Sequence, residues 1–445
     1  MSGSAPRRVA LVAGHFPPSN LAAVHRARLW SQYLPDFNWT PIVVTTDPRY
    51  YEEELDPDIE MLVPRDLRVI RTRALPTRPL RVIGDIGVRG FWWHYRALCK
   101  LAEAGEIDFI HITIPSHFSA PLGRLVFRRY GIPYGIDYID PWVNRWPGVD
   151  KLFSRAWGSY QLAHILEPWS VKDAALITGV AAGYYQGMLE RNPEVARRVV
   201  TAAMPYGGSA RDFDFVRQTP RPIFLWDKDD GLFHMIYAGA LLPAGIVIME
   251  AFFRGLAQLR DTAPETARRI RVHFVGTGRS PNDKQGHQVL PIAARCGVED
   301  MVTEHPHRIG YVDTLNHLTH ADAVVVLGST EPHYTPSKIF QGALSRRPVL
   351  AVLHEASTAV GMVRAARAGR VIAFADGTLP DVGEICRTIA AVVTGDDFDP
   401  QAVDWSIFDD QSARRSAQLL AEAMDLALAR SAARSQARSQ DRPLR

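Results

Sequence analysis

Short apolar segments alternate with helical segments along this chain in two successive series. The first series predicts buried strands at 9–13, 41–46, 67–71, 108–112 and 134–139, and helices at about 21–34, 89–104 and 118–130. The second predicts strands at 234–238, 271–275, 302–304, 323–327 and 348–352, and helices at about 246–260, 286–296, 314–320 and 336–346. Strands that alternate with helices favour a parallel, doubly wound sheet, so this α/β chain is predicted to form two of them.

A passage rich in proline and glycine near 205–222 separates the two series. The 445 residues also exceed what one hydrophobic core usually supports. We therefore expect a Rossmann-like first domain over 1–210 and a Rossmann-like second domain over 211–404, with a cleft between them. A final helix at about 405–430 is expected to cross back and brace the first domain. The repeated Ala-Arg-Ser-Gln composition of 431–445 has no apolar face and predicts a disordered tail.

Several function classes do not fit the composition. The longest apolar runs, such as 322–327 and 348–353, are too short to cross a bilayer, and the start of the chain has no apolar signal region. Cys99, Cys296 and Cys386 lie far apart, without the spacing of a disulfide framework or a zinc site. A net charge of +3 does not demand a nucleic acid. We expect a cytoplasmic protein with no nucleic-acid partner.

Charge is nevertheless concentrated in one stretch. Residues 71–100 carry seven basic side chains and one acidic side chain, a local excess of +6, around the aromatic sequence Arg89-Gly-Phe-Trp-Trp-His-Tyr-Arg96. This pattern fits peripheral contact with an anionic membrane. It equally fits a helix that packs its aromatic residues inward and leaves its arginines in water.

Loops after the strands of an open α/β sheet carry most ligand contacts. After the first predicted strand comes Gly14-His-Phe-Pro-Pro-Ser-Asn20, which leads into a helix with Arg26. Ser19, Asn20 and Arg26 are candidate anion-binding residues at that helix start. A rigid proline turn before a solvated basic helix is an equal alternative.

The strand at 134–139 ends in Asp140-Pro-Trp142. A carboxylate in this position is well placed to act on a hydroxyl group, so Asp140 is the candidate catalytic residue of the first domain, with helix capping as the alternative. The nearby loop contributes His117. His111 lies inside an apolar strand and is interpreted as a core residue.

In the second half, Gly276-Thr-Gly278-Arg279 follows a strand but lacks the third glycine of a dinucleotide fingerprint, and no phosphate-binding P-loop sequence occurs. The segment from Leu327 to Ala343 is more informative. Thr335 or Ser337 can cap a helix that Pro336 opens, which would leave backbone N–H groups and Lys338 to bind a diphosphate. Glu331 and Gln341 offer oxygens for ribose or sugar hydroxyls. An ordinary capped amphipathic helix is the alternative.

These segments together resemble retaining glycosyltransferases of family 4, which have the two-domain GT-B fold. The matching phrases occur in the family's order over about 9–425. They are Phe16-Pro-Pro18 followed by a helix with Arg26, Asp108-Phe-Ile-His111, Ile136-Asp-Tyr-Ile-Asp-Pro-Trp142, Tyr237-Ala-Gly239, Val275-Gly-Thr-Gly278, Gly310-Tyr-Val312 and Thr335-Pro-Ser-Lys-Ile-Phe340.

The resemblance implies transfer of a sugar from a nucleoside diphosphate sugar, with retention at the anomeric carbon and without a metal or other cofactor. It places Asp140 on the acceptor side, Ser337 and Lys338 at the phosphates, Glu331 at the sugar and Gln341 at the ribose. Residues from Arg308 through Gly310 and Tyr311 to Val312 would line the nucleobase pocket, and Gly239 and Gly276 fall in the matching glycine loops. The acceptor would be a glycan, a lipid-linked molecule or a small molecule.

Two departures from the family pattern concern charge. The family's arginine and lysine after the first strand of the second domain are absent from Tyr237-Ala-Gly-Ala-Leu-Leu-Pro-Ala244, and Gln341 replaces a glutamate. Lys338, helix dipoles and Arg26 or Arg279 would then have to stabilise the departing diphosphate.

Three other functions compete with this interpretation. Asp227-Lys-Asp229 after an apolar run is a possible metal site of a different glycosyltransferase fold, although it lies between the two sheets. A sugar-nucleotide epimerase would share the architecture, and a degenerate subunit would bind the nucleotide without catalysis.

Overall fold

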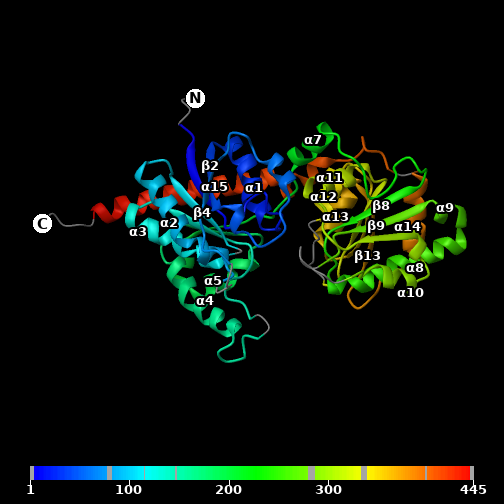
Figure 1. The fold of residues 1–445 in the computed structure, drawn as a ribbon, viewed down its shortest axis with the longest axis horizontal. Coiled ribbons are helices and arrows are strands. Elements are labelled where there is room, and N and C mark those ends of the chain that lie inside the picture. Colours follow the sequence, from blue (N-terminus) through cyan, green and yellow to red (C-terminus); the bar gives the residue numbers. More distant parts are fainter. Residues whose placement is uncertain are drawn as a thin grey trace. The chain divides into compact units, whose positions relative to one another are not determined.

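The computed structural model describes residues 5–77, 83–114, 116–145, 148–278, 286–331, 338–395 and 398–440. The chain divides into two compact units, one made of Met1–Tyr206 with Ala413–Arg445 and the other of Gly207–Ser412. Figure 1 shows the α/β architecture of each. The prediction of two doubly wound α/β sheets is confirmed.

The first unit is built on a seven-stranded parallel sheet with the order β3-β2-β1-β4-β5-β6-β7. Its strands are β1 Arg7–Val12, β2 Trp39–Thr46, β3 Arg68–Thr72, β4 Phe109–Ile114, β5 Tyr134–Tyr138, β6 Leu176–Gly179 and β7 Val200–Ala203. The strand order reverses between β1 and β4, where ligand-binding loops of such sheets diverge. The last two strands were not among those predicted.

Helices cover this sheet. They are α1 Val24–Tyr33, α2 Ile86–Glu103, α3 Pro121–Tyr130, α4 Arg155–Val171, α5 Gly183–Arg191 and α6 Pro193–Ala196, with short 3-10 turns η1 Leu34–Phe37, η2 Pro48–Tyr50, η3 Pro57–Leu62 and η4 His117–Ser119. Asp85 caps α2, because its carboxylate accepts the backbone N–H of Val88.

The C-terminal helix α15, Ala413–Gln440, returns to the first unit, as expected, and packs beside α1 and β7 (Figure 1). The indole of Trp30 donates to the Ser416 hydroxyl at 3.1 Å in this contact. The predicted disorder from 431 onward is wrong for 431–440, which form the last turns of α15. Alanine, arginine and glutamine are strong helix formers and extend the helix without an apolar face. Residues 441–445 lie outside the described part.

The second unit contains a six-stranded parallel sheet with the order β10-β9-β8-β11-β12-β13. Its strands are β8 Phe233–Ala238, β9 Ile270–Val275, β10 Val302–His305, β11 Ala323–Leu327, β12 Val349–His354 and β13 Gly369–Phe374. The order reverses between β8 and β11, so the loops after these two strands flank the switch point. Strand β13 was not predicted.

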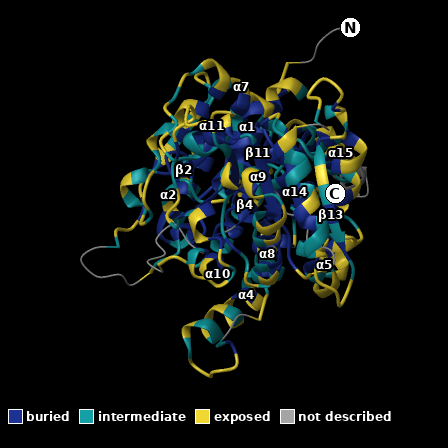
Figure 2. Ribbon diagram, turned by 90° about the vertical axis from the view of Figure 1, so that its right-hand side faces the viewer, coloured by how far each residue is buried: buried dark blue, intermediate teal, exposed yellow. Residues whose placement is uncertain are grey.

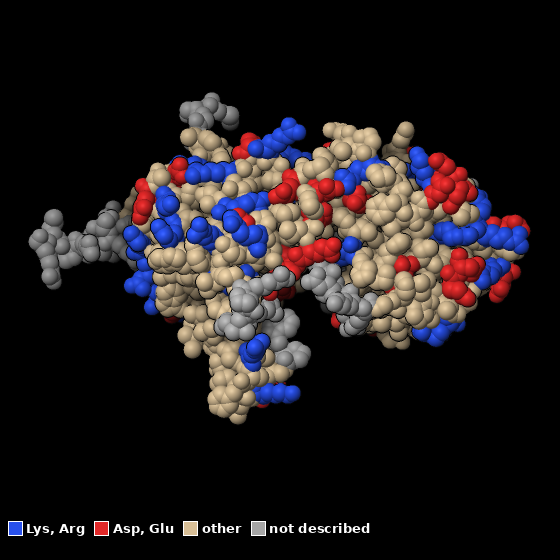
Figure 3. All heavy atoms as spheres, in the orientation of Figure 1, with Lys and Arg blue, Asp and Glu red and all other residues tan. Residues whose placement is uncertain are grey.

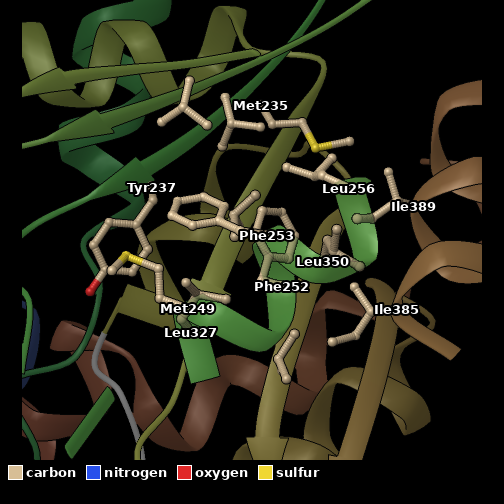
Figure 4. Close-up of a cluster of buried hydrophobic side chains, with 14 of the residues drawn as sticks. Met235, Tyr237, Met249, Phe252, Phe253, Leu256, Leu327, Leu350, Ile385 and Ile389 are labelled. Carbon is tan, nitrogen blue, oxygen red and sulfur yellow. The ribbon is translucent and has the colours of Figure 1, made fainter. Parts of the chain in front are cut away.

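The helices of this unit are α7 Ala210–Gln218, α8 Ile246–Thr262, α9 Pro264–Arg268, α10 Leu290–Arg295, α11 Tyr311–His320, α12 Lys338–Leu344, α13 Thr358–Ala366 and α14 Val382–Thr394, with 3-10 turns η5 Pro243–Gly245, η6 Glu299–Met301 and η7 Trp405–Gln411. Helices α8 and α14 pack together on the sheet (Figure 4), where Phe252, Phe253 and Ile385 meet the strand residues Met235 and Leu350.

Burial follows the layers of each unit. The central strands are almost entirely buried, edge strands such as β3, β7 and β13 are partly exposed, and the helices expose one face (Figure 2). None of the described helices is both long and apolar enough to span a bilayer.

Candidate functional site

Two glycines at the carboxyl ends of β8 and β9 form the floor of the candidate site. Gly239 has a φ of 116° and Gly276 a φ of 69°, both in the region that favours glycine. The Gly239 N–H donates to the Val275 carbonyl at 2.7 Å, and the Gly276 N–H donates to the His305 carbonyl at 2.8 Å. These bonds join the ends of β8, β9 and β10 into one surface. Gly239 and Gly276 leave that surface without side chains at two positions.

Lys338, the first residue of α12, lies over Gly239. Its Nζ donates to the Tyr237 hydroxyl at 2.5 Å and to the Ala240 carbonyl at 2.9 Å, and it sits 3.9 Å from the centroid of the Tyr237 ring. A Cβ at position 239 would lie 2.8 Å from the lysine Cε. The absence of that Cβ is what allows the lysine to reach this position.

Among the described residues, the partners of the Lys338 ammonium group are neutral. In the part of the chain that the structure describes, no carboxylate forms an ion pair with it. Burial lowers the pKa of Lys338 to about 7, because desolvation disfavours the charged form. A cation that lacks a counter-ion is a favourable place for an anionic ligand, whose arrival would raise this pKa again.

The stem of the Arg308 side chain lies beside Gly276. A Cβ on Gly276 would lie 3.6 Å from the Arg308 Cγ, and the same position lies 3.9 Å from the Cα of Gly239. The arginine is exposed, and among the described residues none makes an ion pair with it. The resemblance implied a place in the nucleobase pocket for Arg308, and that role remains a prediction; the structure shows that the stem of its side chain lies next to Gly276.

The loop after β11 joins the same surface. The Thr330 N–H donates to the Ala244 carbonyl at 3.2 Å, and the Glu331 N–H donates to the Ser329 hydroxyl at 3.2 Å. Glu331 is exposed, and Gln341 lies partly buried one turn after Lys338. Arg279, Pro336 and Ser337 lie outside the described residues.

Gly310 and Tyr311 start helix α11. Gly310 is its N-cap, and the Tyr311 hydroxyl donates to the buried carboxylate of Asp212 in α7 at 3.2 Å. This bond gives the Tyr311 hydroxyl a role in holding α7 against α11. The nucleobase role that the resemblance implied for these two residues remains a prediction.

Glu304 is a site residue that sequence reasoning missed. Its buried carboxylate accepts the Thr277 hydroxyl at 2.7 Å on one side of 279–285. On the other side it accepts three backbone N–H groups at 2.9–3.1 Å, those of Gln288, Val289 and Leu290. Glu304 therefore anchors both ends of the loop after β9. A lone glutamate in a short strand gives no sequence signal for this role.

In the first unit, the structure gives Arg26 a structural role. Its guanidinium makes two hydrogen bonds of 2.9 Å to the Asp137 carboxylate and donates to the Met204 and Pro205 carbonyls at 2.7 and 2.9 Å. The side chain is 1% exposed. Because its donors are used inside the fold, we replace the anion-binding interpretation of Arg26 with one of internal support.

Ser19 and Asn20 are held by a neighbouring loop. The buried Ser19 hydroxyl donates to Glu53, and the Asn20 amide donates to Asp56 at 3.2 Å. The polypeptide between β1 and α1 is thus fixed by carboxylates rather than left with free donors. This arrangement does not favour the predicted anion site at Ser19 and Asn20.

Asp140 is exposed just beyond the end of β5. It does not cap the next helix, because α4 begins at Arg155 with Ser154 as its N-cap. His117 lies beside it: its Nε2 is 3.3 Å from the Asp140 carbonyl, and its ring stacks on Trp142 at 5.7 Å. Burial lowers the pKa of His117, so the ring is neutral near pH 7.

His15 belongs to the same electrostatic neighbourhood and was missed as a candidate. Its Nε2 lies 3.6 Å from the Glu53 carboxylate, and burial lowers its pKa, opposed by the charges of Glu53 and Asp85. The negative charge of Asp85 also opposes the lowering of the His117 pKa. The loops after β1, β4 and β5 therefore present two imidazoles among carboxylates, a setting suited to binding hydroxyl groups. His111, in contrast, is a buried core residue bonded to Thr178.

The basic stretch 71–100 is less uniform than its sequence indicates. Arg89 is 2% exposed and donates to the Leu75 and Tyr50 carbonyls. Arg71 pairs with Glu60 at 2.6 Å. Arg78 and Arg81 lie outside the described residues, and Arg96 and Lys100 are exposed on α2.

The Asp227–Asp229 pair lies before β8, at the end of the sheet opposite the two glycines. The Asp227 carboxylate accepts the Asp229 N–H at 3.0 Å and so closes a turn. In the described ranges, no cluster of three or more His, Cys, Asp or Glu side chains is arranged to hold a metal ion.

Gly239→Ala tests how closely the lysine depends on the glycine. The methyl group would displace Lys338 and strain the backbone, so we expect nucleoside diphosphate affinity to fall by about tenfold or more, roughly 1.4 kcal/mol. Gly231→Ala is the matched control: Gly231 has a φ of 75°, and no atom lies within 4 Å of the position that the new methyl group would take. Titration calorimetry should show the loss only for Gly239→Ala, and equal losses in both variants would contradict the role of the lysine contact.

No protein-family model and no curated protein sequence matches this chain. Solved structures do match its fold. An E. coli structure named for trehalose-6-phosphate and bound with UDP-2-fluoro glucose aligns with a TM-score of 0.55 at 12% identity, covering 94% of this chain and 99% of that chain. The α,α-trehalose 6-phosphate synthase from Burkholderia multivorans aligns with a TM-score of 0.54 at 14% identity, covering 99% and 100%.

A putative UDP-N-acetylglucosamine 2-epimerase from Listeria monocytogenes also aligns, with a TM-score of 0.49 at 12% identity over 93% of this chain and 94% of that chain. The first two alignments show that the chain has the two-domain GT-B fold. Since one fold hosts several reactions, the reaction has to be argued from the site.

Proposed function

We propose that this protein is a glycosyltransferase that moves a sugar from a nucleoside diphosphate sugar to an acceptor hydroxyl. The observation that carries the proposal is Lys338 over Gly239, with no carboxylate partner among the described residues, next to Gly276, where the stem of the Arg308 side chain begins. A diphosphate needs close backbone approach and positive charge, and this surface offers both.

In the proposed complex, the diphosphate lies on Gly239 and Gly276, with Lys338 Nζ and Arg308 on its oxygens. Glu331 and Gln341 bind hydroxyl groups of the sugar and ribose. Gly310 and Tyr311 border the nucleobase, and the phosphate contacts of Ser337, Pro336 and Arg279 are assigned from the resemblance alone. Exchange of the neutral partners of Lys338 for phosphate oxygens gives shorter and stronger charge-assisted hydrogen bonds.

We propose that the reaction retains the anomeric configuration and needs no metal. The bond between the anomeric carbon and the diphosphate oxygen breaks, and the acceptor oxygen bonds to that carbon on the same face. The acceptor proton passes to the departing phosphate oxygen. Protonated Lys338 stabilises the charge that develops on the leaving group, which is where preorganised electrostatics contributes most to a rate.

On the first unit, we propose that Asp140 acts on the acceptor. Its carboxylate is exposed, in a residue whose backbone carbonyl contacts His117, and it can accept a hydrogen bond from an acceptor hydroxyl and orient it. Glycans, lipid-linked sugars and small polyols all offer such a hydroxyl.

A transfer assay tests the proposal. A thermal-shift screen of UDP-, GDP-, ADP- and dTDP-sugars in chelator identifies the donor, since a ligand that binds only the folded protein raises its melting temperature. The selected donor should then yield nucleoside diphosphate and an acceptor-linked sugar with the donor's anomeric configuration. A new sugar nucleotide formed without acceptor would identify an epimerase instead, and binding without turnover would identify a binding subunit.

Asp140→Asn separates the acceptor role from donor binding. We expect turnover to fall by about 10²-fold, because the carboxylate is lost while the shape is kept, and donor affinity to stay unchanged. Asp150→Asn, at an exposed acid of the same unit, is the control. Unchanged turnover in Asp140→Asn would refute the assignment.

A further inference from the structure

Helix α4 and the residues before it project from the body of the first unit, and both ribbon views show the projection (Figures 1 and 2). The segment that enters the helix reads Lys151-Leu-Phe-Ser-Arg155. Leu152 is 71% exposed and Phe153 is 88% exposed. Two large adjacent apolar side chains at the end of a projection are costly in water, so they indicate a surface that is covered in use.

The backbone holds Phe153 in this exposed position. Its φ is 61°, in the left-handed region, which is unfavourable for a bulky residue. Its ring packs on Trp157, with centroids 5.4 Å apart. The strained backbone at Phe153 keeps its aromatic ring outside the core. Strain of this kind indicates a functional role for the exposed ring and not a stabilising one.

The apolar surface continues along α4. Leu162, Ile165, Leu166 and Trp169 recur at helical spacing on one face, and the first two are 42% and 67% exposed. With residues of α2, of η4 and of the start of α3 they line a groove with a volume of about 610 Å³. The groove residues from those elements are Val88, Phe91, Phe118 and Pro121. We call the projecting residues 151–155 together with Leu162 and Ile165 the α4 tip.

Positive charge flanks the α4 tip. Lys151 and Arg155 are exposed, and in the described part of the chain no carboxylate pairs with either, since Asp150 pairs with Arg145 at 3.5 Å. On α2, Trp92 is 58% exposed, and Arg96 and Lys100 are exposed on the side that faces β3. Figure 3 shows basic side chains on the projection and over α2 and α3.

We propose that the α4 tip docks on an anionic lipid bilayer, with Leu152 and Phe153 in the interface and Lys151 and Arg155 at the headgroups. An apolar and aromatic tip bracketed by cations matches the two-part energetics of interfacial binding, in which buried apolar area and attraction to anionic lipid add together. The sequence predicted membrane contact through 71–100, whereas this proposal places the contact on α4. The proposal does not depend on the proposed sugar transfer.

Vesicle co-sedimentation of the full-length chain tests the docking. Vesicles with and without about 30% anionic phospholipid are compared at low and high salt, since salt weakens attraction to headgroups. The chain should bind the anionic vesicles only, and less at high salt. Leu152→Ser/Phe153→Ser should weaken binding by about tenfold or more, and Lys151→Gln/Arg155→Gln by a similar factor.

Two controls match these variants. Leu379→Ser replaces a leucine of the second unit that is 59% exposed, and Lys228→Gln/Arg364→Gln removes two exposed cations of that unit. Both should bind vesicles like the unaltered chain, and circular dichroism should show every variant folded. The proposal is overturned if the control variants weaken vesicle binding as much as the α4 tip variants do. It is also overturned if the α4 tip variants bind vesicles as well as the unaltered chain. Light scattering that shows the α4 tip variants dissociating an oligomer, with vesicle binding intact, overturns it in favour of self-association.

Discussion

Lys338→Met is expected to reduce the rate of sugar transfer by about 10²–10³-fold, the range seen when one preorganised donor to developing charge is removed. Methionine keeps most of the apolar stem over Tyr237 and Gly239 and removes only the ammonium group. The loss should therefore appear mainly in turnover, because the charge on the leaving group grows as the glycosidic bond breaks.

Lys228→Met is the matched control, since Lys228 is an exposed lysine of the same unit at the opposite end of the sheet. Its turnover and donor affinity should equal those of the unaltered protein. Steady-state kinetics of both variants with the selected donor makes the comparison. A Lys338→Met enzyme that keeps full turnover would show that the leaving group is stabilised elsewhere.

Arg26→Met is expected to lower the free energy of unfolding of the first unit by about 3–5 kcal/mol, the cost of breaking a buried ion pair from one side. Desolvation raises the pKa of the buried Asp137 carboxyl, and Arg26 opposes it most strongly; without Arg26 the carboxylate would lose its counter-charge and its pKa would rise. Two backbone carbonyls would also lose their donor.

Urea unfolding measures this loss, with Arg128→Met as the control because Arg128 is exposed on α3. Adding Asp137→Leu to Arg26→Met should recover part of the stability, since it removes the unpaired charge. If Arg26 bound the diphosphate instead, Arg26→Met would weaken nucleotide affinity and leave the unfolding midpoint in place.

The sheets were predictable where strands are apolar and long enough to stand out. β4 and β11 are continuous buried runs, and their positions follow from the sequence. β6 has four residues, and β13 begins with glycine and arginine, so neither shows the pattern that distinguishes a strand from a loop. Such strands form because neighbouring strands of the parallel sheet supply backbone pairing, which the local sequence does not show.

The site was predictable in its residue types and less so in its partners. Lys338 was predicted to bind phosphate from its place at a helix start, and that role remains a prediction; its contacts with Tyr237 and Gly239 join residues about a hundred positions apart in the chain. The partner of Arg26, Asp137, is separated from it by 111 positions, so the sequence shows a basic helix and not a buried ion pair. Arg308 likewise reaches Gly276 only through the adjacency of β9 and β10.

Proton uptake on nucleotide binding tests most directly whether Lys338 holds the diphosphate. In the free protein its pKa is about 7, so at pH 8 the amine is mostly neutral, and a bound diphosphate would raise the pKa and draw in a proton. Affinity should accordingly fall as pH rises above 7. Calorimetric titration at pH 8 in two buffers of different ionisation enthalpy counts that proton. We predict uptake approaching one proton per nucleotide in the unaltered protein and none in Lys338→Met; equal uptake in both, or none in either, would contradict the account.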